Sequence, residues 1–310
     1  MKTLHLNPEN DLQNSINCSD ADVIYLEDGI YNQKVEILRD NVTIIGKGAK
    51  TKITFSDYAR KIHADGQEYN TFRTYTLCVT GNGVRLENFT VENSNTDPEV
   101  KGQCVALSVH GNNFSAVNME LISTQDTLFL SPFPDDLVVR YRGFIPRRQL
   151  YREGSNLHLF KDCRISGTVD FIFGCSEAYF KDCEIISLKD KRNYGFAAAP
   201  AHPLAEDRGF TFIGCDFKCG GADEGTVYLA RPWRDFGKCN FINCKLGKHI
   251  NGGLFDKWND TERDKSARFT YFGLECENKL EPVPWGAELT KVQADDIIDE
   301  CTQKFKSLNI

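Results

Sequence analysis

The chain of 310 residues is 41% hydrophobic and 26% charged, and its formal net charge is −7. A chain of this length can bury a sizeable core without disulfides or metals. The acidic balance disfavours nucleic acid as a partner, because phosphate binding needs a basic surface, and no run approaches the ~20 apolar residues of a membrane span. No linker or shift in composition divides the sequence, so we expect residues 1–310 to form one domain.

Residues 1–20 are polar, with neither an apolar core nor a small-residue cleavage site, so they do not resemble a signal peptide. The twelve cysteines form no C-x-x-C pair, and most lie in apolar, strand-like segments. Buried free thiols are therefore expected rather than a disulfide framework. Both features predict a cytoplasmic protein, unless the sequence is that of a trimmed, secreted form.

The first predicted element is a short helix over residues 7–17. Asn7 is a suitable N-cap, Pro8 fits the first helical position, and Leu12 and Ile16 lie four residues apart on one face. We expect this helix to cover the N-terminal end of the strands that follow, because exposed strand edges need a cover.

A six-residue pattern then recurs through the middle of the chain. The copies are LENFTV (86–91), FSAVNM (114–119), FKDCRI (160–165), FKDCEI (180–185), FIGCDF (212–217) and FINCKL (241–246). Their period-2 alternation is typical of strands, and the segments between them are too short and polar for crossover helices. Strands that repeat every ~20 to 30 residues without helices between them predict a parallel β-helix, an all-β fold.

Within this fold, Cys163, Cys183, Cys215 and Cys244 occupy equivalent positions, so we expect them to stack as an internal ladder. An apolar stripe predicts a second helix over residues 286–308, which we expect to cover the C-terminal end of the coil. The alternative architecture is an antiparallel sandwich, which requires hairpin turns every 8–12 residues. The sequence does not have turn signals at that spacing.

Three strand-like segments carry charged or amide groups. These are STQDTLFL (123–130) with Gln125 and Asp126, GTVDFIFG (167–174) with Asp170, and YLARPWRDFG (228–237) with Arg231 and Trp233. Neighbouring coils lie about 5 Å apart, so the segments can converge on one face. An arginine beside Asp170 would keep it ionised, whereas Asp126, farther from that charge, would hold a proton. The segments therefore predict a nucleophile and a general acid/base on neighbouring coils, with Gln125 as a donor to an oxyanion.

Four blocks follow one another along the chain: GQCVALSV (102–109), QDTLFL (125–130), GTVDFIFG (167–174) and ARPW (230–233). They resemble the signature blocks of pectin methylesterases, the carbohydrate esterases that remove methyl groups from polygalacturonate. Residues 71–93, which include Thr74, resemble the stretch ahead of the first block. The resemblance covers roughly residues 20–260 and implies a right-handed parallel β-helix, in agreement with the repeat.

The resemblance also implies roles for individual residues. Asp170 would be the nucleophile that forms an acyl-enzyme, Asp126 the general acid and then base, and Arg231 the partner that holds Asp170. The other implied site residues are Gln103 and Gln125 as donors to the oxyanion, and Trp233, Phe171 and Thr74 as contacts to the sugar rings. No metal or cofactor is implied. The substrate would be methyl-esterified polygalacturonate or oligogalacturonides, and we expect a monomer.

Other interpretations stay open at this point. Asp170 fits a structural salt bridge as well, Gln103 and Gln125 fit an amide ladder, and Trp233 fits plain packing. The alternative functions are a pectate or pectin lyase on the same scaffold and a non-catalytic β-helix that binds polysaccharide.

Three segments depart from the family pattern, and one of them is YGFAAAPAHP (194–203), which replaces a polar stretch. Gln33 replaces an acid in GIYNQ (29–33), a block that we interpret as structural, with Glu36 close by. The segment between the second and third blocks is long and basic, with Arg140, Arg142, Arg147, Arg148 and Arg152. These arginines form either a solvated face or a site for galacturonate carboxylates.

Overall fold

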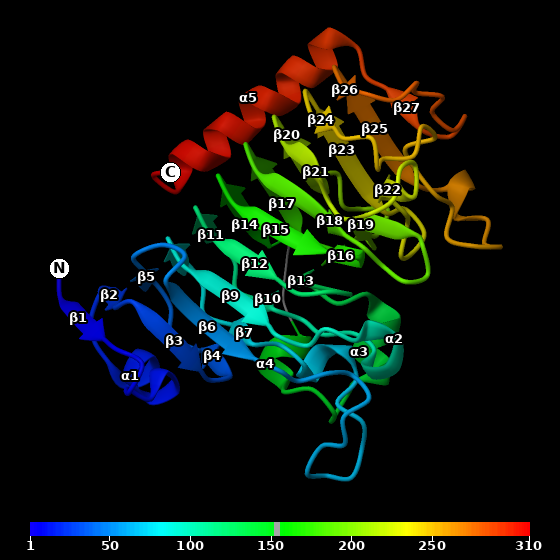
Figure 1. The fold of residues 1–310 in the computed structure, drawn as a ribbon. Coiled ribbons are helices and arrows are strands. Elements are labelled where there is room, and N and C mark those ends of the chain that lie inside the picture. Colours follow the sequence, from blue (N-terminus) through cyan, green and yellow to red (C-terminus); the bar gives the residue numbers. More distant parts are fainter. Residues whose placement is uncertain (152–155) are drawn as a thin grey trace.

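The computed structural model describes residues 1–151 and 156–310. The chain forms a right-handed parallel β-helix in which successive turns add strands to three long sheets (Figure 1). The pairings between the named strands of these sheets are parallel, for example β1 with β2, β13 with β16, and β6 with β9. The predicted fold is therefore confirmed, and the antiparallel sandwich is wrong.

Within each sheet, neighbouring strands come from neighbouring turns of the coil. The eleven-stranded sheet contains β1 (Thr3–Leu6), β2 (Val23–Leu26), β5 (Thr43–Ile45), β8 (Arg85–Glu87), β11 (Phe114–Val117), β14 (Leu157–Lys161), β17 (Glu177–Lys181), β20 (Phe210–Ile213), β23 (Lys238–Ile242), β25 (Arg268–Phe272) and β27 (Ala287–Glu288). The seven-stranded sheet contains β22 (Val227–Ala230), β19 (Gly195–Pro200), β16 (Val169–Gly174), β13 (Leu128–Leu130), β10 (Leu107–Val109), β7 (Leu77–Val79) and β4 (Val35–Ile37). The nine-stranded sheet contains β26 (Glu275–Cys276), β24 (Lys245–Leu246), β21 (Asp216–Gly220), β18 (Glu184–Leu188), β15 (Arg164–Gly167), β12 (Glu120–Ile122), β9 (Thr90–Asn93), β6 (Thr51–Phe55) and β3 (Gly29–Asn32).

The helices lie outside or at the ends of the coil. They are α1 (Leu12–Cys18), α2 (Pro98–Lys101), α3 (Asp135–Arg140), α4 (Arg147–Leu150) and α5 (Lys291–Ser307), with short 3₁₀ turns η1 (Thr71–Arg73) and η2 (Arg263–Lys265). Within the described ranges, none of these helices has the length and apolar composition that crossing a bilayer requires.

A single residue turns the chain from the eleven-stranded to the nine-stranded sheet in each repeat. The residues at this corner have φ between 50 and 63°, and they are Asn88, Asn118, Asp162, Asp182, Gly214 and Asn243. Asparagine, aspartate and glycine adopt this left-handed conformation at the lowest cost. The small or polar third position of the sequence repeat is therefore the corner in five of the six copies. In FSAVNM (114–119) the corner is the fifth residue, Asn118, and Ala116 pairs with Leu86 and Phe160, so the predicted register of that copy is wrong by two residues.

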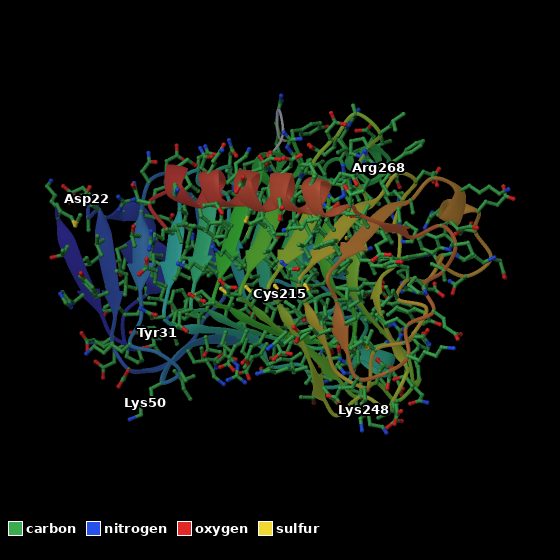
Figure 2. The ribbon with its side chains drawn as sticks, turned by 90° about the horizontal axis from the view of Figure 1, so that it is seen from above. Asp22, Tyr31, Lys50, Cys215, Lys248 and Arg268 are labelled. Carbon is green, nitrogen blue, oxygen red and sulfur yellow. The ribbon has the colours of Figure 1, made fainter. Side chains whose placement is uncertain are left out.

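The residue after each corner points into the core. Cys163, Cys183, Cys215 and Cys244 are at most 1% exposed, and each thiol lies 3.3–3.7 Å from a backbone carbonyl oxygen of the preceding coil. Figure 2 shows Cys215 inside the coil. The predicted cysteine ladder is confirmed, and all twelve cysteines are free thiols.

A second ladder of aromatic rings runs beside the thiols. Phe160, Phe180, Phe212 and Phe241 stack in sequence, with ring centroids 4.6–5.0 Å apart and planes within 13° of parallel. These rings occupy the first position of the repeat, and burial of such side chains supplies much of the driving force for folding.

The N-terminal helix is present but starts later than predicted. Its N-cap is Asp11, whose side chain accepts a hydrogen bond from Asn14 N–H. Asn7 instead accepts from the N–H of Glu9 in a separate turn. Gln33 holds the helix in place, because its Oε1 accepts from Leu12 N–H and its Nε2 donates to the carbonyl of Asn10. These two hydrogen bonds explain why Gln33 stands where the family pattern has an acid, since a carboxylate could not donate to the carbonyl of Asn10.

The C-terminal helix is also present, but it covers a side of the coil rather than its end. Ala294, Cys301 and Phe305 of α5 pack against outward-facing residues of β14, β17, β20 and β23, and Figures 1 and 2 show the helix lying across these strands. At the C-terminal end of the core, Trp285 packs instead, with its ring 5.9 Å from Phe255 and 5.7 Å from Phe269. An apolar stripe predicts that a face is buried, but it does not say against which surface.

The segment from Ser131 to Tyr151, which contains α3 and α4, covers part of the outer face of the seven-stranded sheet. Its side chains Phe133, Leu137, Ile145 and Leu150 join a hydrophobic cluster with residues of β13, β16 and β19. Glu36 anchors the segment, because it accepts hydrogen bonds from Arg148 Nε at 2.8 Å and from Gln149 Nε2 at 3.0 Å. This segment forms one wall of the candidate site.

Candidate active site

The structure brings the predicted polar residues together in one pocket on the outer face of the seven-stranded sheet. The pocket has a volume of about 370 Å³, and its lining includes Gln103, Gln125, Asp126, Asp170, Arg231 and Trp233. Asp126 lies just before β13, Asp170 lies in the neighbouring β16, and Arg231 follows β22, with only β19 between. Side chains 105 residues apart in sequence meet because each coil returns the chain to the same face.

Asp170 and Arg231 form a bidentate ion pair. Arg231 Nε donates to Oδ1 of Asp170 at 2.8 Å and Nη2 donates to Oδ2 at 2.7 Å. The guanidinium lies between two aromatic rings, 3.8 Å from the centroid of Phe196 and 3.9 Å from that of Trp258. Because both faces and one edge of the guanidinium are held, it fixes Asp170 as an oriented carboxylate.

Both acids have left-handed backbone conformations, with φ of 66° at Asp126 and 51° at Asp170. The pairing of β16 with β19 shifts register between Val169 and Ile172, so Asp170 lies in an irregular stretch of its strand. Aspartate adopts this conformation at a lower cost than most side chains. The backbone at Asp170 therefore departs from regular strand pairing, and its carboxylate faces the pocket.

The two glycines of GTVDFIFG make this shape possible. A Cβ at Gly174 would lie 1.9 Å from the carbonyl oxygen of Leu130, and one at Gly167 would lie 2.2 Å from Cβ of Phe171. Gly174 also has φ of 135°, which side chains rarely adopt. Both positions therefore require glycine for the strand to carry Asp170 next to the preceding coil.

Asp126 is in a different electrostatic environment from Asp170. Burial raises the pKa of Asp126 well above its usual range, and the negative charge of Asp170 raises it further. The charges of Arg231 and Arg192 and a hydrogen bond from Gln125 lower this pKa by less. The pocket thus favours one protonated acid beside one ionised acid, which is the division that acid-assisted nucleophilic attack needs.

Gln103 and Gln125 lie on adjacent coils at the edge of the pocket. The backbone N–H of Cys104 donates to the carbonyl of Gln125 at 3.1 Å, so the segments that carry the two glutamines are adjacent. Both side chains are half-buried and line the pocket. An amide at this place can donate to a negatively charged oxygen, and its role as an oxyanion donor stays a prediction.

Two predicted sugar contacts are wrong. Phe171 is fully buried in the main core, as the alternation of a strand requires when Asp170 faces outward, and Ile172 lies in the same core, so the alternation is interrupted there. Phe173 lines the pocket in its place, 5.6 Å from Trp233 in an edge-on contact. Thr74 is fully buried. Its hydroxyl donates to the carbonyl of Thr71 and accepts from Val105 N–H, so it fixes a turn.

Sequence reasoning missed several residues of the pocket wall, which are Asn70, Thr71 and Phe72 around η1, Leu137 and Tyr141 around α3, Ala199 in β19, Arg234 beside Trp233, and Trp258. These residues come mainly from loops whose path does not follow the coil repeat. An isolated tryptophan in the polar stretch 256–264 is the one signal that points to Trp258.

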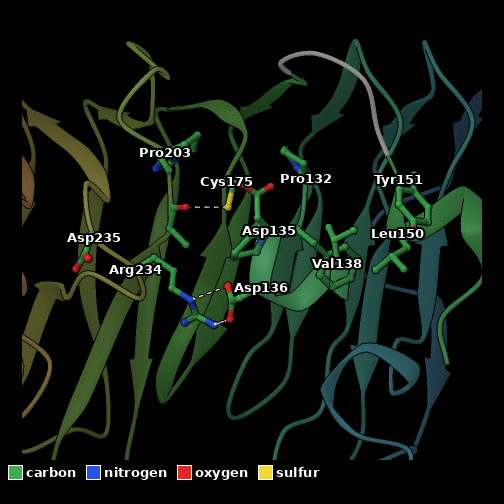
Figure 3. Close-up of a pocket in the computed structure, with 14 residues that line it drawn as sticks. Pro132, Asp135, Asp136, Val138, Leu150, Tyr151, Cys175, Pro203, Arg234 and Asp235 are labelled. Atoms are coloured by element: carbon green, nitrogen blue, oxygen red, sulfur yellow. Dashed lines mark hydrogen bonds and ion pairs between the residues drawn. The ribbon is translucent and has the colours of Figure 1, made fainter. Parts of the chain in front are cut away.

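Two further hollows adjoin the pocket and differ in charge. One, of about 490 Å³, is lined by Asp135, Asp136 and Asp235 and shares Arg234 with the pocket. Figure 3 shows Arg234 paired with Asp136 between this hollow and the pocket, with 2.7 Å from Nη2 of Arg234 to Oδ2 of Asp136. The other hollow, of about 480 Å³, is lined by Arg140 and Arg142 together with Glu68, and it shares Arg140 with the pocket. The three hollows provide room for more than one sugar ring.

The basic segment divides into different roles. Arg140 and Arg142 line the second hollow, whereas Arg148 is paired with Glu36 and Arg147 lies over the ring of Tyr151. Arg152 lies outside the described residues. Among the arginines that the structure describes, Arg140 and Arg142 are the two that remain candidates for a carboxylate site.

The sequence predicts no metal ligands. Within residues 1–151 and 156–310, no group of three or more histidine, cysteine, aspartate or glutamate side chains is placed to hold a metal ion. Metal independence stays a prediction.

Comparisons with known proteins agree with this geometry. A family model described as Pectinesterase matches residues 11–133 and 136–282. Pectinesterase QRT1 of Arabidopsis thaliana is 29% identical over 280 residues, covering 86% of this chain and 66% of that protein. Pectinesterase 31 of the same plant is 30% identical over 288 residues, covering 89% and 81%. The chain thus spans slightly less than two thirds of QRT1.

Among solved structures, the pectin methylesterase from carrot has a TM-score of 0.76 at 18% sequence identity. The match covers 96% of this chain and 95% of that one. At this level of identity the likeness supports the fold alone.

Proposed function

The chain belongs to the pectinesterase family, and we propose that it hydrolyses the methyl esters of galacturonate units in polygalacturonate or its oligomers, releasing methanol. The observation that carries the proposal is the bidentate Asp170–Arg231 ion pair beside the buried carboxyl of Asp126, whose pKa is raised by burial and by the charge of Asp170. One chain contributes every residue that the reaction uses, so a monomer suffices.

In the first step, an Oδ atom of Asp170 attacks the carbonyl carbon of the methyl ester. The carbonyl electron pair moves to oxygen, and the amides of Gln103 and Gln125 donate hydrogen bonds to this oxyanion. When the carbonyl re-forms, the bond to the methoxy oxygen breaks. Asp126 gives its proton to that oxygen, and methanol leaves while the acyl group stays on Asp170.

In the second step, Asp126 is a carboxylate and accepts a proton from water as the water oxygen attacks the acyl carbon. The bond to Asp170 breaks, which restores the Asp170 carboxylate and the protonated Asp126. The new galacturonic acid loses its proton to solvent. The sum of both steps is ester plus water giving acid plus methanol.

A lyase on the same scaffold needs a calcium-binding acid cluster or a basic residue that is free to abstract a proton. Arg231, the arginine nearest the acids, is held by Asp170 and two aromatic rings, so it is poorly suited to act as a base. A binding protein without activity would gain nothing from holding one acid protonated beside an ionised one.

One assay separates these functions. With methyl-esterified trigalacturonate we expect methanol to appear in step with acid, with no rise in ultraviolet absorbance. An unsaturated product with no methanol would indicate a lyase. Binding of the trimer with no product of either kind would indicate a binding module.

The charges of the adjoining hollows suggest which units of the polymer lie on each side of the reacting ester. Arg140 and Arg142 suit free galacturonate carboxylates, since arginine's fork matches a carboxylate. In the other hollow Asp136 is paired with Arg234, whereas Asp135 and Asp235 add negative charge that repels a free carboxylate, so this hollow suits esterified units. We therefore propose that the enzyme favours esters that lie next to a de-esterified stretch.

Replacing both Arg140 and Arg142 with alanine tests this preference. Exposed charge pairs contribute up to about 1 kcal/mol each, so kcat/KM on half-esterified oligomers is expected to fall about 5- to 10-fold. On fully esterified oligomers the change should stay below twofold. The loss should shrink as salt is added, because salt screens exposed charges. Arg147→Ala, in the same segment but outside the lining of the pocket and of both hollows, is the matched control. Equal losses on both substrates would contradict the preference.

A further inference from the structure

Gln125 has a charged neighbour that does not itself line the pocket. Nη2 of Arg192 lies 3.3 Å from Oε1 of Gln125. A guanidinium has only N–H donors, so the group that faces it must be an acceptor. The contact therefore selects one of the two orientations of the amide. The oxygen of Gln125 points to Arg192, and its two N–H groups are left for Asp126 and for the pocket.

Arg192 is itself held firmly. Its Nε and Nη2 donate to the two carboxylate oxygens of Asp190, both at 2.8 Å, and its backbone N–H donates to the same carboxylate at 2.9 Å. Asp190 is only 7% exposed. The guanidinium also lies 5.2 Å from the centroid of the Tyr194 ring. A fork-to-fork pair of this kind fixes direction as well as distance.

Neither Asp190 nor Arg192 lines the pocket. Both belong to the loop between β18 and β19, and neither matches any of the four sequence blocks. We propose that the Asp190–Arg192 pair is a positioning device that holds the Gln125 amide with its N–H groups turned toward Asp126 and the oxyanion. This inference rests on the esterase function proposed above.

The charges around Asp126 agree with this role. Asp126 is faced by Asp170 from β16, by Arg231 from the segment after β22, by Arg192 from the β18–β19 loop, and by Tyr141 at the end of α3. Arg192 and the hydrogen bond from Gln125 both lower the pKa of Asp126. Loss of Arg192 should therefore raise this pKa, and the alkaline limb of the pH profile should move to higher pH.

The test measures methanol release by Arg192→Ala and Asp190→Asn, with Asp223→Asn as the matched control. Asp223 holds Lys189 of the same loop in an exposed ion pair at 2.8 Å. We expect kcat to fall about 10-fold in Arg192→Ala, with KM changed by less than twofold, and Asp223→Asn to match the wild type. Arg192→Lys should recover part of kcat, because an ammonium still donates to the amide oxygen.

A double-mutant cycle with Gln125→Ala distinguishes positioning from a general structural effect. If Arg192 acts through Gln125, then Arg192→Ala lowers kcat in the wild-type background but has little further effect when Gln125 is already alanine. Additive losses in the cycle, an unchanged kcat in Arg192→Ala, or an equal loss in Asp223→Asn would overturn the inference. A wild type that releases no methanol would instead contradict the esterase function itself.

Discussion

Asp170→Asn is expected to lower kcat for methanol release by about 10³- to 10⁴-fold, which corresponds to about 4 to 5.5 kcal/mol of transition-state stabilisation. Asparagine has the same shape and can still accept a hydrogen bond from Arg231, but a neutral amide oxygen is a far weaker nucleophile than a carboxylate. The measurement is the initial rate on methyl-esterified trigalacturonate, with circular dichroism to confirm the fold.

The matched control for this variant is Asp182→Asn. Asp182 is also an aspartate in the left-handed conformation, with φ of 53°, but it is exposed at a corner of the coil. Its replacement should leave kcat within twofold of the wild type. If Asp170→Asn kept more than a tenth of the wild-type rate, Asp170 would be a structural acid and the proposed mechanism would be wrong.

Asp126→Asn is expected to lower kcat on the methyl ester by about 10²- to 10⁴-fold, because methoxide is a poor leaving group without a proton donor. An aryl ester of galacturonate tests the assigned role. A phenolate leaves without help, so acylation should recover, whereas deacylation should stay slow because the general base is missing. We expect a burst of phenol equal to the enzyme concentration, followed by slow turnover. Absence of both burst and rescue would show that Asp126 does not act as the acid.

The pH dependence follows from the same residue. Burial and the charge of Asp170 raise the pKa of Asp126, so the acid form persists to higher pH than for an exposed aspartate. Activity should fall as the pH rises through this raised pKa, and this limb of the pH profile of kcat/KM should be lost in Asp126→Asn.

Much of this architecture could be predicted from the sequence because each coil repeats the same local requirements. A residue such as Asp182 that tolerates a left-handed corner is followed by a small buried residue such as Cys183, and an aromatic residue such as Phe180 precedes both. Three features recur together, so their shared period predicts the coil. The convergence of Asp126, Asp170 and Arg231 follows, since coil neighbours are fixed once the period is known.

The remainder could not be predicted because it depends on departures from that period. Alternation from an outward Asp170 predicts the inward Phe171, but it cannot foresee that Ile172 also faces inward and that Phe173 therefore reaches the pocket. Trp258 reaches the pocket from a loop without strand character. The direction of α5 along the side of the coil depends on outward residues such as Tyr179, which look no different in sequence from ordinary surface positions.

The proposed mechanism requires that one pocket holds two carboxyl groups in opposite states of protonation, Asp126 protonated and Asp170 ionised. Infrared difference spectroscopy at neutral pH between the wild type and Asp126→Asn measures this directly. We expect the wild type to show the stretching band of a protonated carboxyl that Asp126→Asn lacks and that Asp182→Asn keeps. A wild type without such a band, or a band that persists in Asp126→Asn, would contradict the division of roles between Asp126 and Asp170.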